Sequence, residues 1–387
     1  MPDLETRFRG LDRVRGPDLW PDIETREQRP MPEGGTPRRM AVAVVALALA
    51  AGGAVLATRA FLGGEPAVER PVRPAESPPA PVDPVVDVTL PIRWPSSIVY
   101  GEGSIWVAAS ANDGTGAGTI YRIDPETGEI LAEVPVPSVP GWEVGGGGME
   151  VTDGSVWIAG YLDDGDQGAL LRVDAATDAL ADVVPLGGQF AGDVAVDELG
   201  IWVTVFDEPS VELIRLDPGT LTVEMRSSLG TDWARELLVV DGHVWVRSSQ
   251  GTLVEVDPSG GGVTSRVEVP GGVTSVTSFE GALWAATWKA DPGYLLARID
   301  PATGTMDLLP SDSIGGLVDG GPSGLWGRWD PGAGTLGVAQ VDLVTGSVDA
   351  SAPLERGSDV IAMAVASDSV WVASYEEGVT RVELRPA

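Results

Sequence analysis

A short phrase of apolar and polar positions recurs seven times along the chain. In its second copy, DGSVWIAG at residues 153–160, a polar turn dipeptide precedes an apolar run that contains tryptophan. The equivalent tryptophans are spaced by 51, 45, 43, 39, 42 and 45 residues, and they are Trp106, Trp157, Trp202, Trp245, Trp284, Trp326 and Trp371. A repeat of roughly 40 to 45 residues is typical of a four-stranded propeller blade.

A second phrase follows each of the first six tryptophans. It reads RIDPETG at residues 122–128, and related forms occur around Asp174, Asp217, Asp257, Asp300 and Asp342. Asp-Gly and Asp-Pro-x-Thr-Gly form tight turns because they supply the positive or preset φ that such turns need. In the second repeat these turns separate four apolar runs, 149–152, 156–161, 169–173 and 179–186. Each repeat is therefore predicted to be an antiparallel four-stranded meander.

The tryptophan runs carry few polar residues on either side of the strand. Such a run is expected where both faces of a sheet are covered by neighbouring blades. Large aromatic rings fill the gaps between blades well, so we interpret the seven repeated tryptophans as packing residues rather than ligand contacts. The fold class predicted from the repeats is all-β, a seven-bladed β-propeller with four-stranded blades.

The seventh repeat is incomplete, because its runs 360–366, 369–374 and 379–384 supply only three strands. Residues 85–91, VVDVTLP, read like the fourth strand of the other repeats. We predict that this N-terminal strand pairs with 379–384 and closes the ring, which removes an open sheet edge. The propeller is accordingly placed at residues 85–387.

Residues 40–58 form an uncharged run rich in alanine, valine and leucine. As a helix this run would be roughly 28 Å long, close to the hydrocarbon thickness of a bilayer. We therefore predict a single transmembrane helix at 40–62 as the contact with the membrane. A cleaved signal peptide is the alternative, with a cleavage site at residues 55–57, although 39 preceding residues are many for such a signal.

The segments on either side of this anchor differ in composition. Residues 1–39 are polar with two weakly helical patches, and we predict that they form a partly disordered cytosolic segment. The alternative is a docking peptide that binds a cytosolic protein through Phe8, Leu11, Trp20 and Ile23. Residues 63–84 contain seven prolines and are predicted to be a stalk. The N-terminus is expected in the cytoplasm and the C-terminal domain outside it, in a single-pass protein of the cell membrane.

Charge limits the partners of the propeller. Residues 74–387 carry 14 basic and 47 acidic side chains, a net charge of 14 − 47 = −33. A nucleic acid would be repelled by such a domain, so we expect no nucleic-acid partner. The chain has no cysteine, which excludes disulfides and thiolate metal sites.

Because the strands alternate in direction, the loops between second and third strands and the loops between consecutive blades lie on the same face of the ring. We call this face the loop face. Aromatic residues and acids predicted near this face would suit a sugar, a peptide or a cation. The candidate ligand-binding residues are Trp142, Trp233, Trp288, Trp329, Tyr161, Phe206 and Tyr375, and Trp94 lies near the same face. The acids include Asp207, Glu208, Asp291, Asp330, Glu376 and Glu377. The alternative is that the rings pack their own loops.

A carboxylate-rich loop on the same face is the one metal candidate. Asp163, Asp164 and Asp166 give the density of oxygens that Ca²⁺ favours, but the loop lacks the spacing and the final glutamate of a calcium loop. No other cofactor is expected. The chain has one histidine, His243, for which we find no partner motif, so a Ser-His-Asp set is excluded. We expect it to be a half-buried strand residue.

The phrases GSIWVA at 103–108 and RIDPETG at 122–128 resemble those of streptogramin-lyase-like and related YVTN-type propellers, over residues 85–387. The resemblance implies the propeller fold. It also implies that lyase members use histidine with a divalent metal, and the single histidine of this chain departs from that pattern, so no catalytic residue is carried over. The string FRGLDR at 8–13, followed by PDLW at 17–20, resembles the cytosolic starts of actinobacterial membrane proteins of the sigma-factor-regulator kind.

These observations favour a membrane-anchored, extracytoplasmic propeller that acts as a ligand-binding, protein-binding or sensing module. We expect binding rather than catalysis. The alternative is an exported propeller lyase or hydrolase that uses carboxylates of the loop face, since paired acids can perform general acid–base chemistry when their pKa values are pushed apart.

Overall fold

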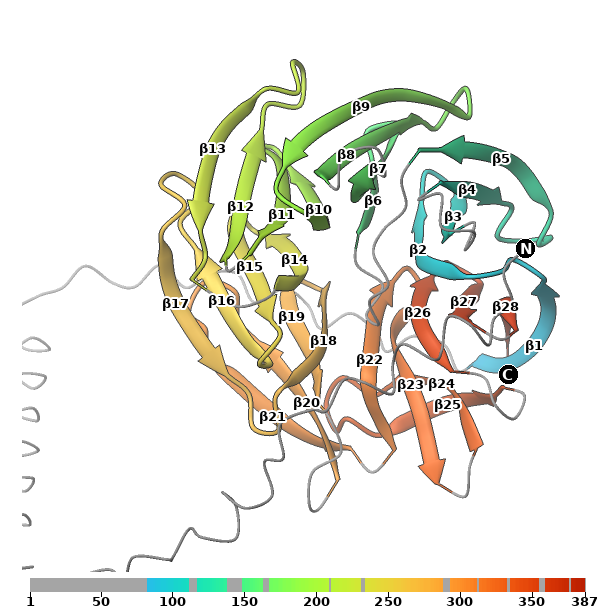
Figure 1. The fold of residues 1–387 in the computed structure, drawn as a ribbon. Helices are drawn as coiled ribbons and strands as arrows, with labels where there is room; N and C mark the ends of the chain where they lie inside the picture. The colour runs from blue at the N-terminus through green and yellow to red at the C-terminus, as the bar shows by residue number, and fades with distance from the viewer. Residues whose placement is uncertain are drawn as a thin grey trace, which may run out of the picture. The chain divides into compact units, whose positions relative to one another are not determined.

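The computed structural model describes residues 82–110, 117–137, 148–162, 167–208, 210–230, 234–287, 293–311, 313–332, 335–354, 359–375 and 377–386. Within these ranges the strands form seven antiparallel sheets of four strands each, set around a common centre (Figure 1). The prediction of an all-β, seven-bladed propeller with four-stranded blades is confirmed.

The strands of each blade follow one another from the centre outward. The innermost strands are β2 (Pro95–Gly101), β6 (Met149–Thr152), β10 (Phe190–Asp197), β14 (Ala234–Val240), β18 (Val273–Phe279), β22 (Ile314–Gly321) and β26 (Val360–Val365). The second strands are β3 (Ser104–Ser110), β7 (Ser155–Leu162), β11 (Gly200–Asp207), β15 (His243–Ser248), β19 (Ala282–Thr287), β23 (Gly324–Gly332) and β27 (Ser369–Ser374).

The third and fourth strands complete the blades. The third strands are β4 (Gly118–Ile123), β8 (Gln167–Asp174), β12 (Ser210–Leu216), β16 (Thr252–Val256), β20 (Tyr294–Ile299), β24 (Thr335–Val341) and β28 (Gly378–Pro386). The outermost strands are β5 (Ile130–Val136), β9 (Ala179–Gly187), β13 (Val223–Ser228), β17 (Val263–Glu268), β21 (Met306–Ser311), β25 (Val348–Pro353) and β1 (Val82–Leu90).

The N-terminal strand closes the ring, as predicted. β1 pairs with β28 in the sheet order β1-β28-β27-β26, and Val86 lies opposite Val382. The Arg381 guanidinium is 2.6 Å from the carboxylate of Asp87 across this pair. The strand begins at Val82, three residues before the predicted start at 85, so residues 82–84 are strand rather than stalk. The seventh blade thus combines strands from both ends of the propeller.

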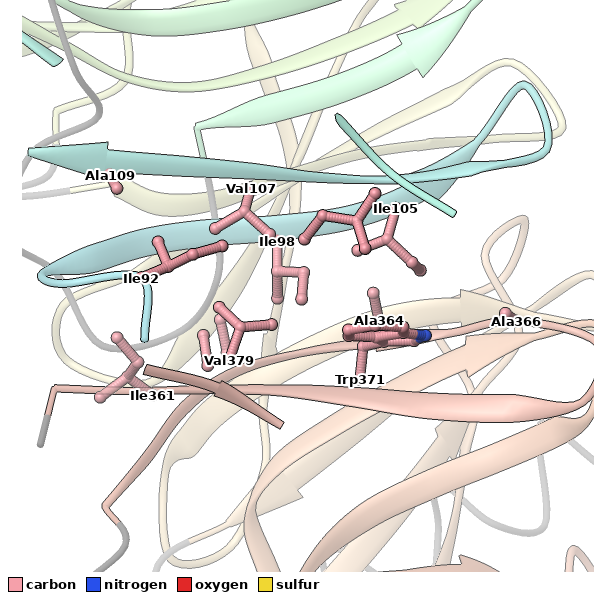
Figure 2. Close-up of a cluster of buried hydrophobic side chains, with 13 residues drawn as sticks. Ile92, Ile98, Ile105, Val107, Ala109, Ile361, Ala364, Ala366, Trp371 and Val379 are labelled. Carbon is pink, nitrogen blue, oxygen red and sulfur yellow. The ribbon is translucent and has the colours of Figure 1, made fainter. Parts of the chain in front are cut away.

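The repeated tryptophans pack inside the ring, as predicted. All seven are buried, with at most 4% of each residue exposed. At the contact between the seventh and first blades, Trp371 packs with Ile98, Ile105 and Val379 in one apolar cluster (Figure 2). Burying such a side chain stabilises the fold by about 3 kcal/mol relative to exposure.

The Asp-containing turns are built by their own side chains. Oδ1 of Asp124 accepts hydrogen bonds from the backbone N–H of Glu126 at 2.9 Å and of Thr127 at 2.8 Å, and Gly128 takes the positive φ of 74° that ends the turn. The backbone hydrogen bond from Thr127 is the main cause that holds the pKa of Asp124 below its usual value. The phrase therefore recurs because it folds the same turn in each blade.

The N-terminal predictions lie beyond the described residues. These are the cytosolic segment 1–39, the anchor at 40–62 and residues 63–81 of the stalk. In the ranges that the structure describes, no helix combines the length and apolar character needed to cross a membrane.

Candidate functional site

All seven innermost strands contribute to one cavity of about 240 Å³ at the centre of the ring. We call it the central cavity. Four carboxyl side chains lie in its wall: Glu150 on β6, Asp193 on β10, Glu236 on β14 and Asp319 on β22. Four acids around one small cavity are unusual, because a buried carboxylate needs compensating donors or cations.

Two positions of the repeat place these acids at the centre. Asp193 and Glu236 stand nine residues before their repeated tryptophans, and Glu150 and Asp319 stand seven before theirs. Residues two apart in a strand share a face, so both positions point to the same side of the innermost strand. A register irregularity lies at the first of these positions: in β10 it spans Asp193, and in β14 it directly precedes Glu236. The repeat therefore presents two side chains per blade to the cavity.

Asp193 joins three blades through backbone hydrogen bonds. Its Oδ2 accepts from the N–H of Leu237 at 2.7 Å, and its Oδ1 accepts from the N–H of Val194 at 2.8 Å and from that of Gly148. Burial raises the pKa of Asp193 to about 7, although these three donors oppose the shift. This carboxyl is therefore committed to the structure of the ring.

In the part of the chain that the structure describes, Glu236 is the one acid of the four with a cationic partner. The Nε–H of Arg247 donates to Oε2 of Glu236 at 2.6 Å, and the N–H of Val276 in the next blade donates to the same oxygen at 2.9 Å. Oε1 of Glu236 is buried and accepts no hydrogen bond from the described residues. Burial raises the pKa of Glu236, and the charge of Arg247 opposes that shift.

Asp319 is also held by its neighbours. The Thr277 hydroxyl of the adjacent blade donates to Oδ1 at 3.2 Å, and the backbone N–H groups of Gly320 and Val365 donate to the same carboxyl. Burial raises its pKa to about 7 against these donors. Like Asp193, it connects its own blade to the blade that follows.

Glu150 differs from the other three acids. Among the described residues it has neither a hydrogen bond nor an ion pair, and it lines the central cavity with partial exposure. Burial, followed by the charges of Asp193 and Asp319, raises the pKa of Glu150 to about 7. The cavity therefore holds one carboxyl whose charge nothing in the described structure compensates.

The four acids surround the cavity rather than converge on one point. Across the ranges that the structure describes, no group of three or more histidine, aspartate or glutamate side chains is arranged to hold a metal ion. With Arg247 as the cation in contact with these acids, full ionisation leaves the group with a net charge of 1 − 4 = −3. Such a cavity favours cations over anions.

Several of the aromatic candidates on the loop face are described. Trp94 and Tyr375 lie together, with 6.3 Å between ring centroids, so the β1–β2 connection meets the end of β27. Tyr161 and Trp329 are half-buried. Phe206 stacks on Phe190 at 4.2 Å and is only 5% exposed, so it packs in the apolar core between the third and fourth blades. Their role in ligand binding stays a prediction.

The other candidates on the loop face lie outside the described residues. They are the aromatic residues Trp142, Trp233 and Trp288 and the calcium candidates Asp163, Asp164 and Asp166. Of the acids predicted near this face, Asp330 accepts a hydrogen bond from the Tyr294 hydroxyl at 3.1 Å. This contact links the fifth and sixth blades.

His243 has a partner that the sequence analysis missed. Its Nδ1 is 2.8 Å from Oε1 of Glu255, on the neighbouring strand β16. The pair is not apparent as a motif because the two residues are 12 positions apart and meet only through strand pairing. The expected half-buried position is confirmed, with 31% of the side chain exposed.

The central cavity was not among the predicted sites, because its acids lie on innermost strands and the predicted candidates lie near loops. A signal was present, since Asp193 and Glu236 place an acid at the same distance, nine residues, before the repeated tryptophan. A polar residue at a repeated buried position marks a site in the structure that needs a partner.

Comparison with known proteins identifies the fold. No family model matches the sequence, and no curated protein matches it either. Among solved structures, 1323 chains are similar, and one of them is the Pan2 WD40 domain of Neurospora crassa. That domain has a TM-score of 0.55 and 11% identity, over 76% of this chain and 90% of the domain. At 11% identity the similarity establishes the propeller fold alone, so the function has to be inferred from the site.

Proposed function

We propose that this protein is a binding module whose propeller takes a positively charged ligand at the central cavity. The observation that carries the proposal is the wall of that cavity, where four carboxyl groups lie and, among the described residues, Arg247 is their one cationic contact. The net charge of −33 over residues 74–387 supports it, because an acidic domain attracts cations over long distances.

The contacts of the acids favour binding over catalysis. Asp193, Glu236 and Asp319 each accept a backbone N–H from a neighbouring blade, so their movement would disturb the ring. A general acid or base must reach the substrate and exchange a proton with it. Carboxyls that hold neighbouring blades together are poorly placed for that exchange.

An exported lyase or hydrolase is the second candidate. One observation favours it: the pKa values of Glu150 and Asp193 are raised to about 7, which is near the working pH of a general acid or base. The two candidates differ in the fate of the bound compound. A ligand recovered unchanged after prolonged incubation supports binding, and conversion to a product supports the enzyme.

We further propose that the propeller is displayed outside the cytoplasm by the predicted anchor at 40–62, with the stalk between them. The length and composition of the uncharged run support this arrangement. Protease should be added to cells whose outer layers are permeable and whose cytoplasmic membrane is intact. It should then degrade the propeller and spare residues 1–39. Degradation of 1–39 with protection of the propeller would reverse the topology. A pull-down with residues 1–39 as bait would test for the proposed cytosolic partner.

The loop face provides a second contact region in this proposal. Trp94 is 37% exposed and lies beside Tyr375, and aromatic faces attract cations. Trp142 and Trp233 are predicted on the same face. Alanine variants of these two residues should lose affinity while the melting temperature changes little. A loss of folding without a loss of affinity would show that the rings pack their own loops.

A thermal-shift screen with the full chain in detergent tests the proposed function. Small organic cations and size-matched anions would be compared at equal concentration and ionic strength. A ligand that binds the folded state raises the melting temperature by mass action, so cations should raise it and anions should not. Equal responses to both sets, or a response to anions alone, would contradict the proposal.

A further inference from the structure

We propose that Glu150 is the carboxylate that receives the ligand, and that the ligand presents a primary ammonium or a guanidinium group to it. This inference rests on the proposed function and specifies its chemistry. It follows from comparing how the charge of each acid in the central cavity is compensated by the residues around it.

Three of the four acids have their partners within the protein. Asp193 accepts three backbone N–H groups, Asp319 accepts two together with a hydroxyl, and Glu236 pairs with Arg247. Glu150 has no hydrogen bond or ion pair among the described residues, although it lines the same cavity. A carboxylate in such a place is costly unless a donor or a cation joins it. An external cation is therefore expected to make its most favourable electrostatic interaction at Glu150.

A second free acceptor lies in the same wall. Oε1 of Glu236 belongs to a residue that is 4% exposed, and no described residue donates to it. The Ser275 hydroxyl interacts with the Glu236 carboxyl, which opposes the rise in the pKa of Glu236, and it also donates to the carbonyl of Val318 at 3.4 Å. A buried acceptor without a donor is uncommon in native proteins and indicates a missing partner. Both free acceptors call for a ligand that donates hydrogen bonds.

The arrangement of acceptors suits an organic cation better than a metal ion. Ca²⁺ takes six to eight oxygen ligands at short range, and no group of three acidic or histidine side chains in the described ranges is arranged to provide them. An ammonium or guanidinium group instead needs a carboxylate for its charge and separate acceptors for its N–H groups. The cavity of about 240 Å³ has room for a small cation of this kind.

The surroundings of Glu150 make its binding of a cation dependent on pH. The charged groups facing it across the cavity are Asp193, Glu236 and Asp319, with Arg247 already paired to Glu236. Together with burial, the negative charges of Asp193 and Asp319 raise the pKa of Glu150 to about 7. Below that pH a proton occupies the carboxyl and competes with the cation. Affinity should therefore be about tenfold higher at pH 8 than at pH 6.

Calorimetric titration of the full chain in detergent tests the assignment, with 1,4-diaminobutane and methylguanidinium as probes. Glu150→Gln keeps the size of the side chain and removes its charge, and Glu129→Gln makes the same change on an exposed turn of the first blade. Since a charge-assisted hydrogen bond contributes about 1.5 to 3 kcal/mol, Glu150→Gln should weaken binding at least tenfold at pH 8. Glu129→Gln should leave the affinity unchanged.

The outcomes separate this inference from the proposed function. Equal binding of a probe by the wild type and by folded Glu150→Gln would overturn the assignment of Glu150 and leave the cation-binding function standing. No saturable binding of any cation would overturn both. Saturable binding of Ca²⁺ alone would overturn the ammonium or guanidinium class. A melting temperature for Glu150→Gln at or above that of the wild type would show that loss of binding is not loss of folding.

Discussion

Oδ2 of Asp193 accepts a hydrogen bond from the backbone N–H of Leu237 at 2.7 Å, so the third blade holds the fourth at their innermost strands. The same relationship recurs one blade further on, where Oε2 of Glu236 accepts from the N–H of Val276 at 2.9 Å. In both cases a side chain nine residues before the repeated tryptophan meets the N–H eight residues before the next one. These contacts connect consecutive blades at the wall of the central cavity.

Replacing Asp193 by alanine should destabilise the ring. The change leaves the N–H groups of Gly148, Val194 and Leu237 without their acceptor, and a buried donor without a partner costs about 1 to 3 kcal/mol. The free energy of unfolding in urea should therefore fall by about 3 kcal/mol or more. Asp207→Ala removes an exposed carboxylate at the end of β11 and should change it by less than about 0.5 kcal/mol. Equal effects of the two substitutions would show that the contacts at Asp193 contribute little.

Arg122 links the first two blades farther from the centre. Its guanidinium lies 5.3 Å from the ring centroid of Trp106 and donates to the carbonyl of Ala175 at 3.0 Å and to Asp178 at 3.1 Å. Arg122→Ala should lower the free energy of unfolding by about 2 kcal/mol, through lost packing on the ring and the lost donor. Arg266→Ala, on the outermost strand β17, is the matched control because its side chain is exposed. A loss as large in the control would contradict a specific role for the link.

Stability should decrease as the pH rises from 5.5 to 8. The folded-state pKa values of Glu150, Asp193 and Asp319 are raised to about 7, above their ordinary values of 4.5 and 3.8. The folded protein therefore binds more protons than the unfolded chain between about pH 4 and pH 7, and the free energy of unfolding falls across that window. A decrease of at least about 2 kcal/mol between pH 5.5 and pH 8 is expected from thermal or chemical unfolding.

Two comparisons make this pH dependence specific. Glu150→Gln removes one of the three groups, so it should reduce the decrease by roughly a third if the groups contribute equally. The turn aspartates act at lower pH, because hydrogen bonds in their turns lower the pKa values of Asp124, Asp174 and Asp217. The stability that these aspartates contribute to the fold is fully present above the pKa of aspartate in the unfolded chain. It is lost as the pH falls through their lower pKa in the folded protein. A protein equally stable at pH 5.5 and pH 8 would contradict the raised values in the cavity.

The ring and its closure could be predicted because the relevant signals are local and repeated. Each turn phrase contains the Asp and Gly that build its turn, and the spacing between tryptophans counts the blades. The closing strand was recognisable because residues 85–91 match the fourth strands of other repeats, although the strand begins at Val82. No long-range contact had to be known to reach these conclusions.

The candidate site could be predicted only in part, because equivalent positions of different repeats are surrounded by different residues in the folded ring. Phe206 and Tyr375 both stand four residues after a repeated tryptophan, yet Phe206 stacks on Phe190 and is buried, whereas Tyr375 lies beside Trp94 and is half-buried. Which acid lacks a partner is likewise decided by residues of the neighbouring blades, which lie 40 to 44 positions away in sequence for Glu236 and Asp193. That information exists only once the ring is assembled.

The central claim is that Glu150 exchanges a proton for a cationic ligand in the central cavity. Calorimetric titration with 1,4-diaminobutane at pH 7, in two buffers of different ionisation enthalpy, counts the protons released on binding. With a pKa of about 7 for Glu150, release of at least about half a proton per ligand is expected from the wild type, and a smaller release from Glu150→Gln, in which only Asp193 and Asp319 titrate in this range. Binding with the same proton count in both proteins, or with none in the wild type, would contradict the account.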